Sequence, residues 1–296
     1  MCRWLGYFGN PIPVSELLYD APHSLIDQSR DARLMSTVFN LDGFGLGWYR
    51  DSREHPGVYR TISPPRNDPN LRELASQIRS PLFVAHVRAA TGTPVQQSNC
   101  HPFRHGRWLF VHNGFIDEFL TVRRELMFAI DPELFPAIVG TTDSEVLFYL
   151  ALTFGLEEDP LGALERMAGF VEAVGHSHDI AEPLQMTIGL SDGERLYAAR
   201  YASGPVVNTL FVSEDTRLPR DERPGGGVHL LPGRAAGTLL YEENKPLPHL
   251  SAEARAIVSE PVADLPGLWN EVPAGSALIV GPEPDVRLAF TPQPPS

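Results

Sequence analysis

Short apolar runs bounded by turn residues fill the first 116 residues of the chain, and this pattern is typical of β-strands. The expected strands cover residues 1–9, 37–50, 81–90 and 106–116. Asp42-Gly43 predicts a tight turn inside the second run, and Asn113-Gly114 predicts that the fourth run ends in a turn, because these residue types tolerate a positive φ. Between the first two runs, Ser15 is expected to cap the start of a helix in SELLYD.

After residue 116 the apolar positions recur every three or four residues, which is the spacing of amphipathic helices. Helices are therefore expected within residues 117–130, 144–156 and 159–176. The pattern returns to strands over residues 184–202, where Ser191-Asp192-Gly193 predicts a hairpin turn. Strands followed by helices and again by strands, without a regular βαβ alternation, favour a layered α+β fold over a doubly wound parallel sheet.

The last third of the chain has a different texture. Residues 217–237 are rich in proline, glycine and charge, which predicts a loop. The segments AIVSEP and SALIVG predict late strands, and the final TPQPPS predicts a frayed tail. We therefore expect a single domain over residues 2–296, with a core over about 2–213 and a loop-rich C-terminal extension over about 214–296; a small second domain after residue 215 is the alternative.

The composition is that of a globular protein, with 43% hydrophobic and 21% charged residues. The formal net charge of −13 argues against a nucleic-acid partner, which requires a broad basic face. No apolar run of about 18 residues predicts a membrane span, and no basic start followed by an apolar run predicts a signal peptide. The simplest expected location is the cytoplasm, without a membrane partner.

Cys2 stands directly behind the initiator methionine and is one of two cysteines in 296 residues. With Cys100 it cannot form a disulfide framework, so in a reducing compartment it is either inert or reactive. Removal of Met1 would place a thiol and a free α-amine on the same residue. That amine titrates near pH 8, so at neutral pH its unprotonated fraction can accept the thiol proton without a catalytic histidine.

Three further segments carry groups that attack on an amide requires. Asn113 and Gly114 offer a side-chain amide and a backbone N–H as two donors for a tetrahedral oxyanion. Arg88 offers a planar fork for an α-carboxylate, and Asp143 offers the opposite charge for an α-ammonium group. Taken singly, these residues have structural alternatives: a hairpin turn, a salt bridge and a helix cap. Taken together with Cys2, they predict a nucleophile that acts on a substrate with an amino-acid end.

The segments MCRWLGY, DGFGLGWY, HVRAATG, NCHPF, HNGF and TTDSE together resemble the class II glutamine amidotransferases, which are N-terminal nucleophile hydrolases with a cysteine as first residue. The likeness extends to the stand-alone YafJ-like and EgtC-like branch, in which HSL…QS also occurs near the start. It covers at least residues 1–210 in order, and VSEP…WNEVP is similar to the closing segment of the same branch. The family's fold, a four-layer αββα sandwich, agrees with the α+β expectation.

The resemblance implies a role for each matching position. Cys2 would be the nucleophile, and Asn113 and Gly114 would form the oxyanion hole. The implied substrate-binding residues are Arg88, Thr91, His101, Asp143 and Gly43. In this chain Asp42 stands before Gly43, where the synthase-linked relatives have arginine, so the role of that arginine is not carried over. No cofactor is implied, and the substrate is a small molecule, glutamine or another γ-glutamyl compound.

Other functions are weighed against this one. Cys100, His101 and His105 are close in sequence, but their spacing fits no strong zinc signature, so no metal site is expected. A non-enzymatic binding module of the same fold is disfavoured because all four chemical elements are present. Two reactions remain open: glutaminase activity that supplies ammonia to a separate synthase subunit, or hydrolysis of a γ-glutamyl compound such as a γ-glutamyl thiol or peptide, which the EgtC-like resemblance slightly favours.

Overall fold

The structure is a computed structural model that describes residues 2–34, 42–50, 55–90, 92–214, 254–264 and 267–295. Its strands are β1 (Arg3–Pro13), β2 (Phe44–Tyr49), β3 (Gly57–Thr61), β4 (Arg79–Val87), β5 (Phe103–His105), β6 (Trp108–Ile116), β7 (Leu184–Ser191), β8 (Leu196–Ala202), β9 (Phe211–Ser213), β10 (Arg255–Val258), β11 (Trp269–Glu271), β12 (Ser276–Val280) and β13 (Val286–Ala289). Its helices are α1 (Leu25–Gln28), α2 (Pro69–Gln77), α3 (Phe119–Phe128), α4 (Asp143–Thr153) and α5 (Pro160–Ser177), with short helical turns η1 (Glu16–Asp20), η2 (Pro65–Asn67), η3 (Gln97–Asn99) and η4 (Phe135–Ala137).

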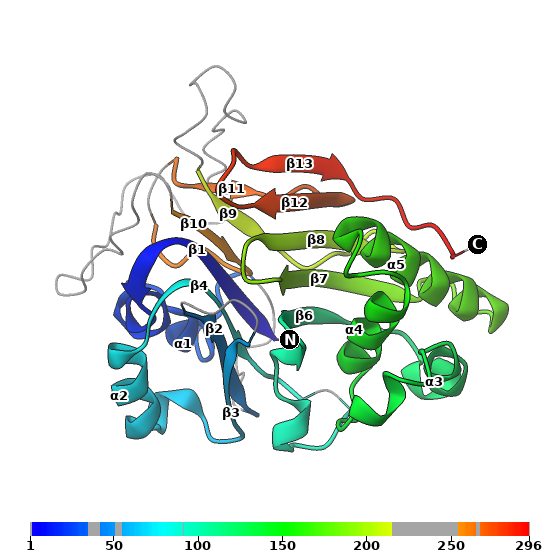
Figure 1. The fold of residues 1–296 in the computed structure, drawn as a ribbon, viewed down its shortest axis with the longest axis horizontal. Coiled ribbons are helices and arrows are strands. Elements are labelled where there is room, and N and C mark those ends of the chain that lie inside the picture. The colour runs from blue at the N-terminus through cyan, green and yellow to red at the C-terminus, as the bar shows by residue number, and fades with distance from the viewer. Residues whose placement is uncertain are drawn as a thin grey trace.

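The strands form two antiparallel sheets. The seven-stranded sheet has the order β11-β9-β10-β1-β4-β2-β3, and the six-stranded sheet has the order β13-β12-β8-β7-β6-β5. Figure 1 shows α1 and α2 beside the first sheet and α3, α4 and α5 beside the second, with the two sheets between them. The arrangement confirms the expected α+β sandwich with four layers, αββα.

Three clusters of buried side chains fill the spaces between these layers. One lies between the sheets, where Trp4 and Val84 of the first sheet meet Val111 and Leu278 of the second. A second packs α3, α4 and α5 on the six-stranded sheet, and a third packs α1 and α2 on the seven-stranded sheet. The apolar three-to-four spacing of α5 is explained by this packing, since its inward positions contact the sheet. No described helix has the length and apolarity needed to cross a membrane.

Residues beyond 213 contribute strands to both sheets. β10 pairs with β1 in the first sheet, and β12 pairs with β8 in the second. The expected loop over 217–237 lies outside the described residues, and the division into core and extension stays a prediction. The frayed tail is wrong for the described residues: Thr291 N–H donates to Glu165 Oε1 at 2.8 Å, and Gln293 N–H donates to the Glu165 carbonyl at 3.1 Å.

Two local expectations near the N-terminus are also corrected. β1 does not stop before its prolines but runs to Pro13, with a register shift against β4 between Phe8 and Ile12. Proline has no N–H to donate to a neighbouring strand, and such an irregularity allows a strand to contain prolines. Ser15 makes no capping hydrogen bond, because the following segment is a single π-helical turn rather than an α-helix. The start of the second expected strand, residues 37–41, lies outside the described residues.

Candidate active site

Three of the predicted site residues lie at the same end of three neighbouring strands of the seven-stranded sheet. Arg3 on β1 pairs with Val87 on β4, and Val87 pairs in turn with Phe44 on β2. The residues one step beyond this row are Cys2, Arg88 and Gly43. β1 is the middle strand of the sheet; β4 pairs with it from Arg3 onward and β10 from Leu5 onward, so the strand that follows Cys2 has neighbours on both sides.

The Cys2 thiol is half-buried against the backbone of Ala89. Ala89 N–H donates to Cys2 Sγ at 3.4 Å, and the thiol donates to the Ala89 carbonyl at 3.6 Å. Burial raises the pKa of the Cys2 thiol and Asp143 raises it further, whereas the Ala89 hydrogen bond and the charge of Arg88 lower it. Because the balance is upward, the thiol is protonated at neutral pH and needs a base before it can act as a nucleophile.

Arg88 is buried at the end of β4 and is held by the loop that follows. Its Nη2 donates to Thr93 Oγ1 at 2.7 Å and to the Pro94 carbonyl at 3.1 Å. Its Nη1 is buried and has no hydrogen-bond partner among the described residues. A buried N–H without an acceptor is costly, so this geometry suits a bound carboxylate better than the salt bridge considered from the sequence.

The start of β2 fixes the backbone around Arg88. Arg88 N–H donates to the Gly43 carbonyl at 2.8 Å, and Asp42 N–H donates to the Arg88 carbonyl at 3.0 Å. Asp42 Oδ2 also accepts the Ala90 N–H at 2.7 Å, which gives this unusual aspartate a structural role. Gly43 has a φ of 147°, and a Cβ there would lie 2.5 Å from Cys100 Sγ, so no side chain fits at this position.

Asp143 is the first residue of α4 and faces the end of β6. Its Oδ2 accepts the Ile116 N–H at 2.9 Å, and its Oδ1 accepts the Ser144 N–H at 2.7 Å. The capping alternative belongs instead to Thr142, whose hydroxyl accepts the Glu145 N–H at 3.2 Å. The Ser144 hydroxyl also donates to Asp143 Oδ1, at 3.2 Å. A carboxylate has about four acceptor positions, so Asp143 retains capacity on Oδ2 for a ligand, and the helix N-terminus favours its charge.

Asn113 and Gly114 do not form the expected turn. Both lie inside β6, and Asn113 pairs with Thr187 on β7, which extends far enough to pair with β6 through its end. Asn-Gly permits a turn but does not require one, and here pairing with β7 continues past Asn113-Gly114 to Ile116 and Leu184. Gly114 is nevertheless required, because a Cβ there would collide with the Gln185 carbonyl. The Asn113 Nδ2 is buried and has no hydrogen-bond partner among the described residues.

A hydrogen-bond chain across the two sheets links the nucleophile strand to Asn113. Trp4 Nε1–H donates to Thr187 Oγ1 at 3.1 Å, and the Thr187 hydroxyl donates to the Asn113 carbonyl at 3.4 Å. Asn208 Nδ2 donates to the same carbonyl at 3.1 Å. All four side chains are buried. The sequence analysis missed Thr187 and Asn208 because nothing in their surroundings marks them. The register of β6 and β7 places Thr187 beside Asn113, and the segment between β8 and β9 brings Asn208 to the same carbonyl.

Three buried histidines, His86, His101 and His112, lie near Arg88 and Asp143. The rings of His86 and His101 stack at 4.1 Å, and His112 Nδ1 lies 2.8 Å from Ser144 Oγ. Burial lowers the pKa of His86 to about 3 and lowers the pKa of His101 and His112 as well, so all three are neutral. Among the described residues, no three His, Cys, Asp or Glu side chains gather where they could hold a metal ion.

Glu260 joins two sequence segments that the motif analysis quoted without a role. It accepts from His23 Nε2 at 2.7 Å and from Arg33 N–H at 2.8 Å, and its Oε2 lies 3.7 Å from Arg3 Nε. Arg3 Nη1 in turn donates to the Cys2 carbonyl at 2.9 Å. HSL…QS and VSEP are therefore connected to the nucleophile through a buried charged network.

We expect Glu260→Gln to lower the free energy of unfolding by about 3 kcal/mol, because it removes a buried carboxylate that faces the Arg3 guanidinium and bonds to His23. Burial raises the pKa of Glu260, but the bonds from His23 and Arg33 and the charge of Arg3 outweigh it, so the net pKa is lowered. The contribution of Glu260 is thus present above the ordinary glutamate pKa and is lost as pH falls through the lower folded value.

Urea unfolding between neutral and acidic pH measures both effects. The matched control is Glu283→Gln, which breaks the exposed pair with Arg195 and should change stability by less than about 1 kcal/mol. Equal stability of the two variants at neutral pH would contradict a charged network around Glu260.

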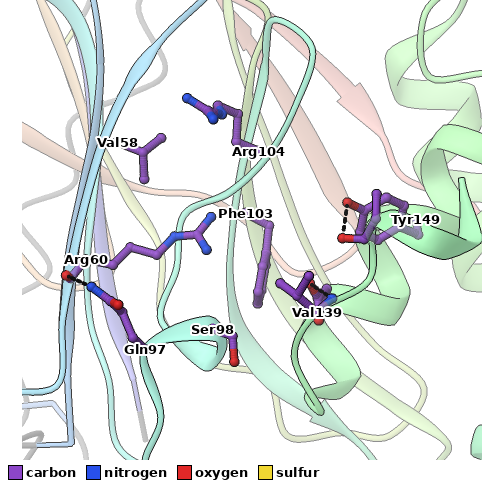
Figure 2. A pocket seen from close by; sticks show the side chains of 10 residues that line it. Val58, Arg60, Gln97, Ser98, Phe103, Arg104, Val139 and Tyr149 are labelled. Carbon is purple, nitrogen blue, oxygen red and sulfur yellow. Dashed lines mark hydrogen bonds between the residues drawn. The ribbon is translucent and has the colours of Figure 1, made fainter.

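The described residues also form a pocket of about 450 Å³ beside this end of the seven-stranded sheet. Figure 2 shows its wall residues, and Cys2, Arg88, Asn113 and Asp143 are not among them. The geometry around Cys2, rather than this pocket, therefore defines the candidate active site. Of the predicted site residues, Thr91 lies outside the described part of the chain; the roles of the others stay predictions.

Known proteins similar in sequence indicate the family of the chain. Residues 26–211 match the family model described as glutamine amidotransferases class-II. The probable glutamine amidotransferase DUG3 of Saccharomyces cerevisiae is 33% identical over 227 residues, which cover 68% of this chain and 64% of the yeast protein. The γ-glutamyl-hercynylcysteine sulfoxide hydrolase of Mycobacterium tuberculosis is 31% identical over 218 residues, 73% of this chain and 87% of that enzyme.

Solved structures are similar as well. A glutamine aminotransferase class-II domain protein from Silicibacter pomeroyi has a TM-score of 0.66 and 31% identity, with 98% of this chain and 100% of that chain covered. The glutamine phosphoribosylpyrophosphate amidotransferase of B. subtilis, with a TM-score of 0.60 and 16% identity, covers 98% of this chain and 50% of its own and shares the fold.

Proposed function

Because this chain belongs to the class II glutamine amidotransferases, an amide-hydrolysing family, we propose that its Cys2 attacks the γ-glutamyl amide of glutamine or of another γ-glutamyl compound. The products are glutamate and ammonia or an amine, and water resolves the intermediate thioester. The observation that carries the proposal is the position of the Cys2 thiol beside Arg88, whose buried Nη1 has no acceptor among the described residues.

In this proposal the α-amine of Cys2 activates the thiol of the same residue. Since burial keeps the Cys2 thiol protonated, a base must remove the proton, and the α-amine freed by loss of Met1 is the group on the same residue. Intact mass should therefore show the active protein without Met1. A chain that retains Met1 carries that amine as an amide and should be inactive.

The γ-glutamyl head is held by opposite charges. Arg88 presents a buried N–H to the α-carboxylate, and Asp143 presents its remaining acceptor positions to the α-ammonium. Gly43 supports this site by leaving no side chain between Arg88 and Cys100. Thr91 and His101 complete the proposed substrate-binding residues. His101 is buried and neutral, and it lines the site near Arg88.

The oxyanion hole consists of Asn113 Nδ2 and the Gly114 N–H. The amide of Asn113 is buried and has no partner among the described residues, as expected of a donor reserved for a transition state. The chain from Trp4 through Thr187 to the Asn113 carbonyl fixes this donor relative to the strand that carries Cys2. Thr187 and Asn208 are thus positioning residues.

We expect Thr187→Val to lower kcat about tenfold with little change in KM, because a misplaced oxyanion donor weakens the transition state rather than substrate binding. Alkylation of Cys2 by iodoacetamide should keep its rate, since that reaction does not use the donor. Thr153→Val is the matched control, because Thr153 donates to the Tyr149 carbonyl on α4 and has no part in these hydrogen bonds. A parallel loss in the control, or a rise in KM alone, would count against the positioning role.

The leaving group is the main open choice. The mycobacterial relative is named for a γ-glutamyl substrate, which supports hydrolysis of a γ-glutamyl compound as the whole reaction. Supply of ammonia to a separate synthase subunit, or an inactive module of this fold, are the alternatives. The cytoplasmic location stays a prediction from the sequence.

Glutamate release from glutamine, γ-glutamylcysteine, γ-glutamylglycine and γ-glutamyl ethylamide decides between these possibilities. Higher kcat/KM for a γ-glutamyl amino acid than for glutamine supports the hydrolase. Preference for glutamine supports the ammonia donor, and no Cys2-dependent release from any of the four refutes the proposed activity.

A further inference from the structure

The pocket beside the active site has a strongly polar wall. It lies between β3, η3, β5 and the segment before α4, and Figure 2 shows Arg60, Phe103 and Arg104 around its opening. The Arg60 guanidinium lies over the Phe103 ring at 5.8 Å, and its Nε is buried without a hydrogen-bond partner among the described residues. Arg104 donates from Nη1 to the Pro56 carbonyl at 3.1 Å.

The pocket carries more positive than negative charge. Its acidic residue is Glu145, and both carboxylate oxygens already accept backbone N–H groups, from Val139 at 3.1 Å and from Gly140 at 2.7 Å. Glu145 therefore offsets only part of the charge of Arg60 and Arg104. An anionic group is the ligand that this wall would attract.

The pocket also has apolar lining residues. Val58, Ala137, Val139 and the ring of Phe103 line it, and its volume of about 450 Å³ is that of a site for a small organic molecule rather than for a single ion. We propose that this pocket is a second ligand site, which binds a small organic carboxylate with its anionic group at Arg60 and its apolar body against Phe103 and Val139.

The pocket adjoins the γ-glutamyl site but is separate from it. Thr93 and Pro94 hold Arg88, whereas Gln97 and Ser98 of the same segment line the pocket. Asn99 follows them and donates to the Pro94 carbonyl and to the Thr141 hydroxyl, and these bonds hold the segment that separates the two sites. A ligand in the pocket and a substrate at Arg88 can thus be bound together.

Calorimetric titration at low ionic strength tests this site, with benzoate and inorganic phosphate as probes. We expect benzoate to bind saturably and at least about tenfold more tightly than phosphate, because only benzoate contacts the apolar lining residues. Arg60→Gln should weaken benzoate at least about tenfold. Arg66→Gln, which alters an exposed arginine paired with Asp27, is the control and should leave benzoate binding unchanged.

Arg104→Gln, at the exposed rim, gives a second variant should Arg60→Gln fail to fold. In the Cys2→Ala protein, which lacks the proposed nucleophile, saturating glutamine should leave benzoate binding within a few-fold of its original affinity, whereas displacement would place benzoate at Arg88. Displacement, equal affinity for phosphate, unchanged binding in both pocket variants or no binding would each overturn the proposal. None of these results depends on whether glutamine is hydrolysed, so the pocket and the proposed activity fail separately.

Discussion

Cys2→Ala is expected to reduce glutamate release from γ-glutamyl substrates by at least about 10⁴-fold, because no other group can form the thioester. The second cysteine is no substitute: Cys100 is fully buried, and its thiol contacts the Thr61 carbonyl at 3.5 Å. The measurement is a coupled assay for glutamate on protein whose fold has been checked by circular dichroism.

Cys100→Ser is the matched control for this substitution. Serine keeps a donor toward Thr61 and nearly the same volume, so this variant should retain more than about a tenth of the activity. Comparable activity of Cys2→Ala and the unsubstituted protein would refute the nucleophile assignment. Loss of activity only in Cys100→Ser would move the chemistry to the other thiol.

Arg88→Lys is expected to lower kcat/KM about 100-fold or more, which corresponds to roughly 3 kcal/mol, chiefly through a higher KM. Lysine can reach either Thr93 or a substrate carboxylate, but it cannot present the planar fork that now bonds Thr93 and Pro94 through one nitrogen and leaves Nη1 for a ligand. Steady-state kinetics with glutamine and γ-glutamylcysteine measure the effect.

Arg79→Lys provides the comparison at the other end of the same strand. Arg79 is exposed and donates to the Pro11 carbonyl at 2.8 Å, so its replacement should leave kcat/KM within about twofold. A similar small change for Arg88→Lys would show that Arg88 does not hold the substrate.

The layers of the fold follow from local patterns because each helix and strand buries one face. The spacing of apolar residues placed α4 and α5 within a few residues of their observed bounds, and Ser191-Asp192-Gly193 does separate β7 from β8. The family, too, was predictable from the short motifs, and residues 26–211 match its model.

What could not be predicted depends on partners distant in sequence. Asn113-Gly114 has the composition of a turn, and only its pairing with β7 makes it a strand. Thr187 contacts Asn113 because of strand register, and Asn208 contacts it because of the path of the chain between β8 and β9; a single sequence reveals neither. Glu260 gains its role from Arg3 and His23, more than 230 residues away, and no local pattern indicates such a network.

The place of β1 between β4 and β10 has a consequence for maturation in the cell. A ribosome releases β4 long before β10, so the growing chain can pair β1 on one edge only until residues 255–258 have emerged. Cys2 rests against Ala89, which follows β4, so its position is set by the pairing of β1 with β4 and not by β10. We therefore expect the first residues to be most accessible to an aminopeptidase before residues 79–89 have emerged and paired with β1.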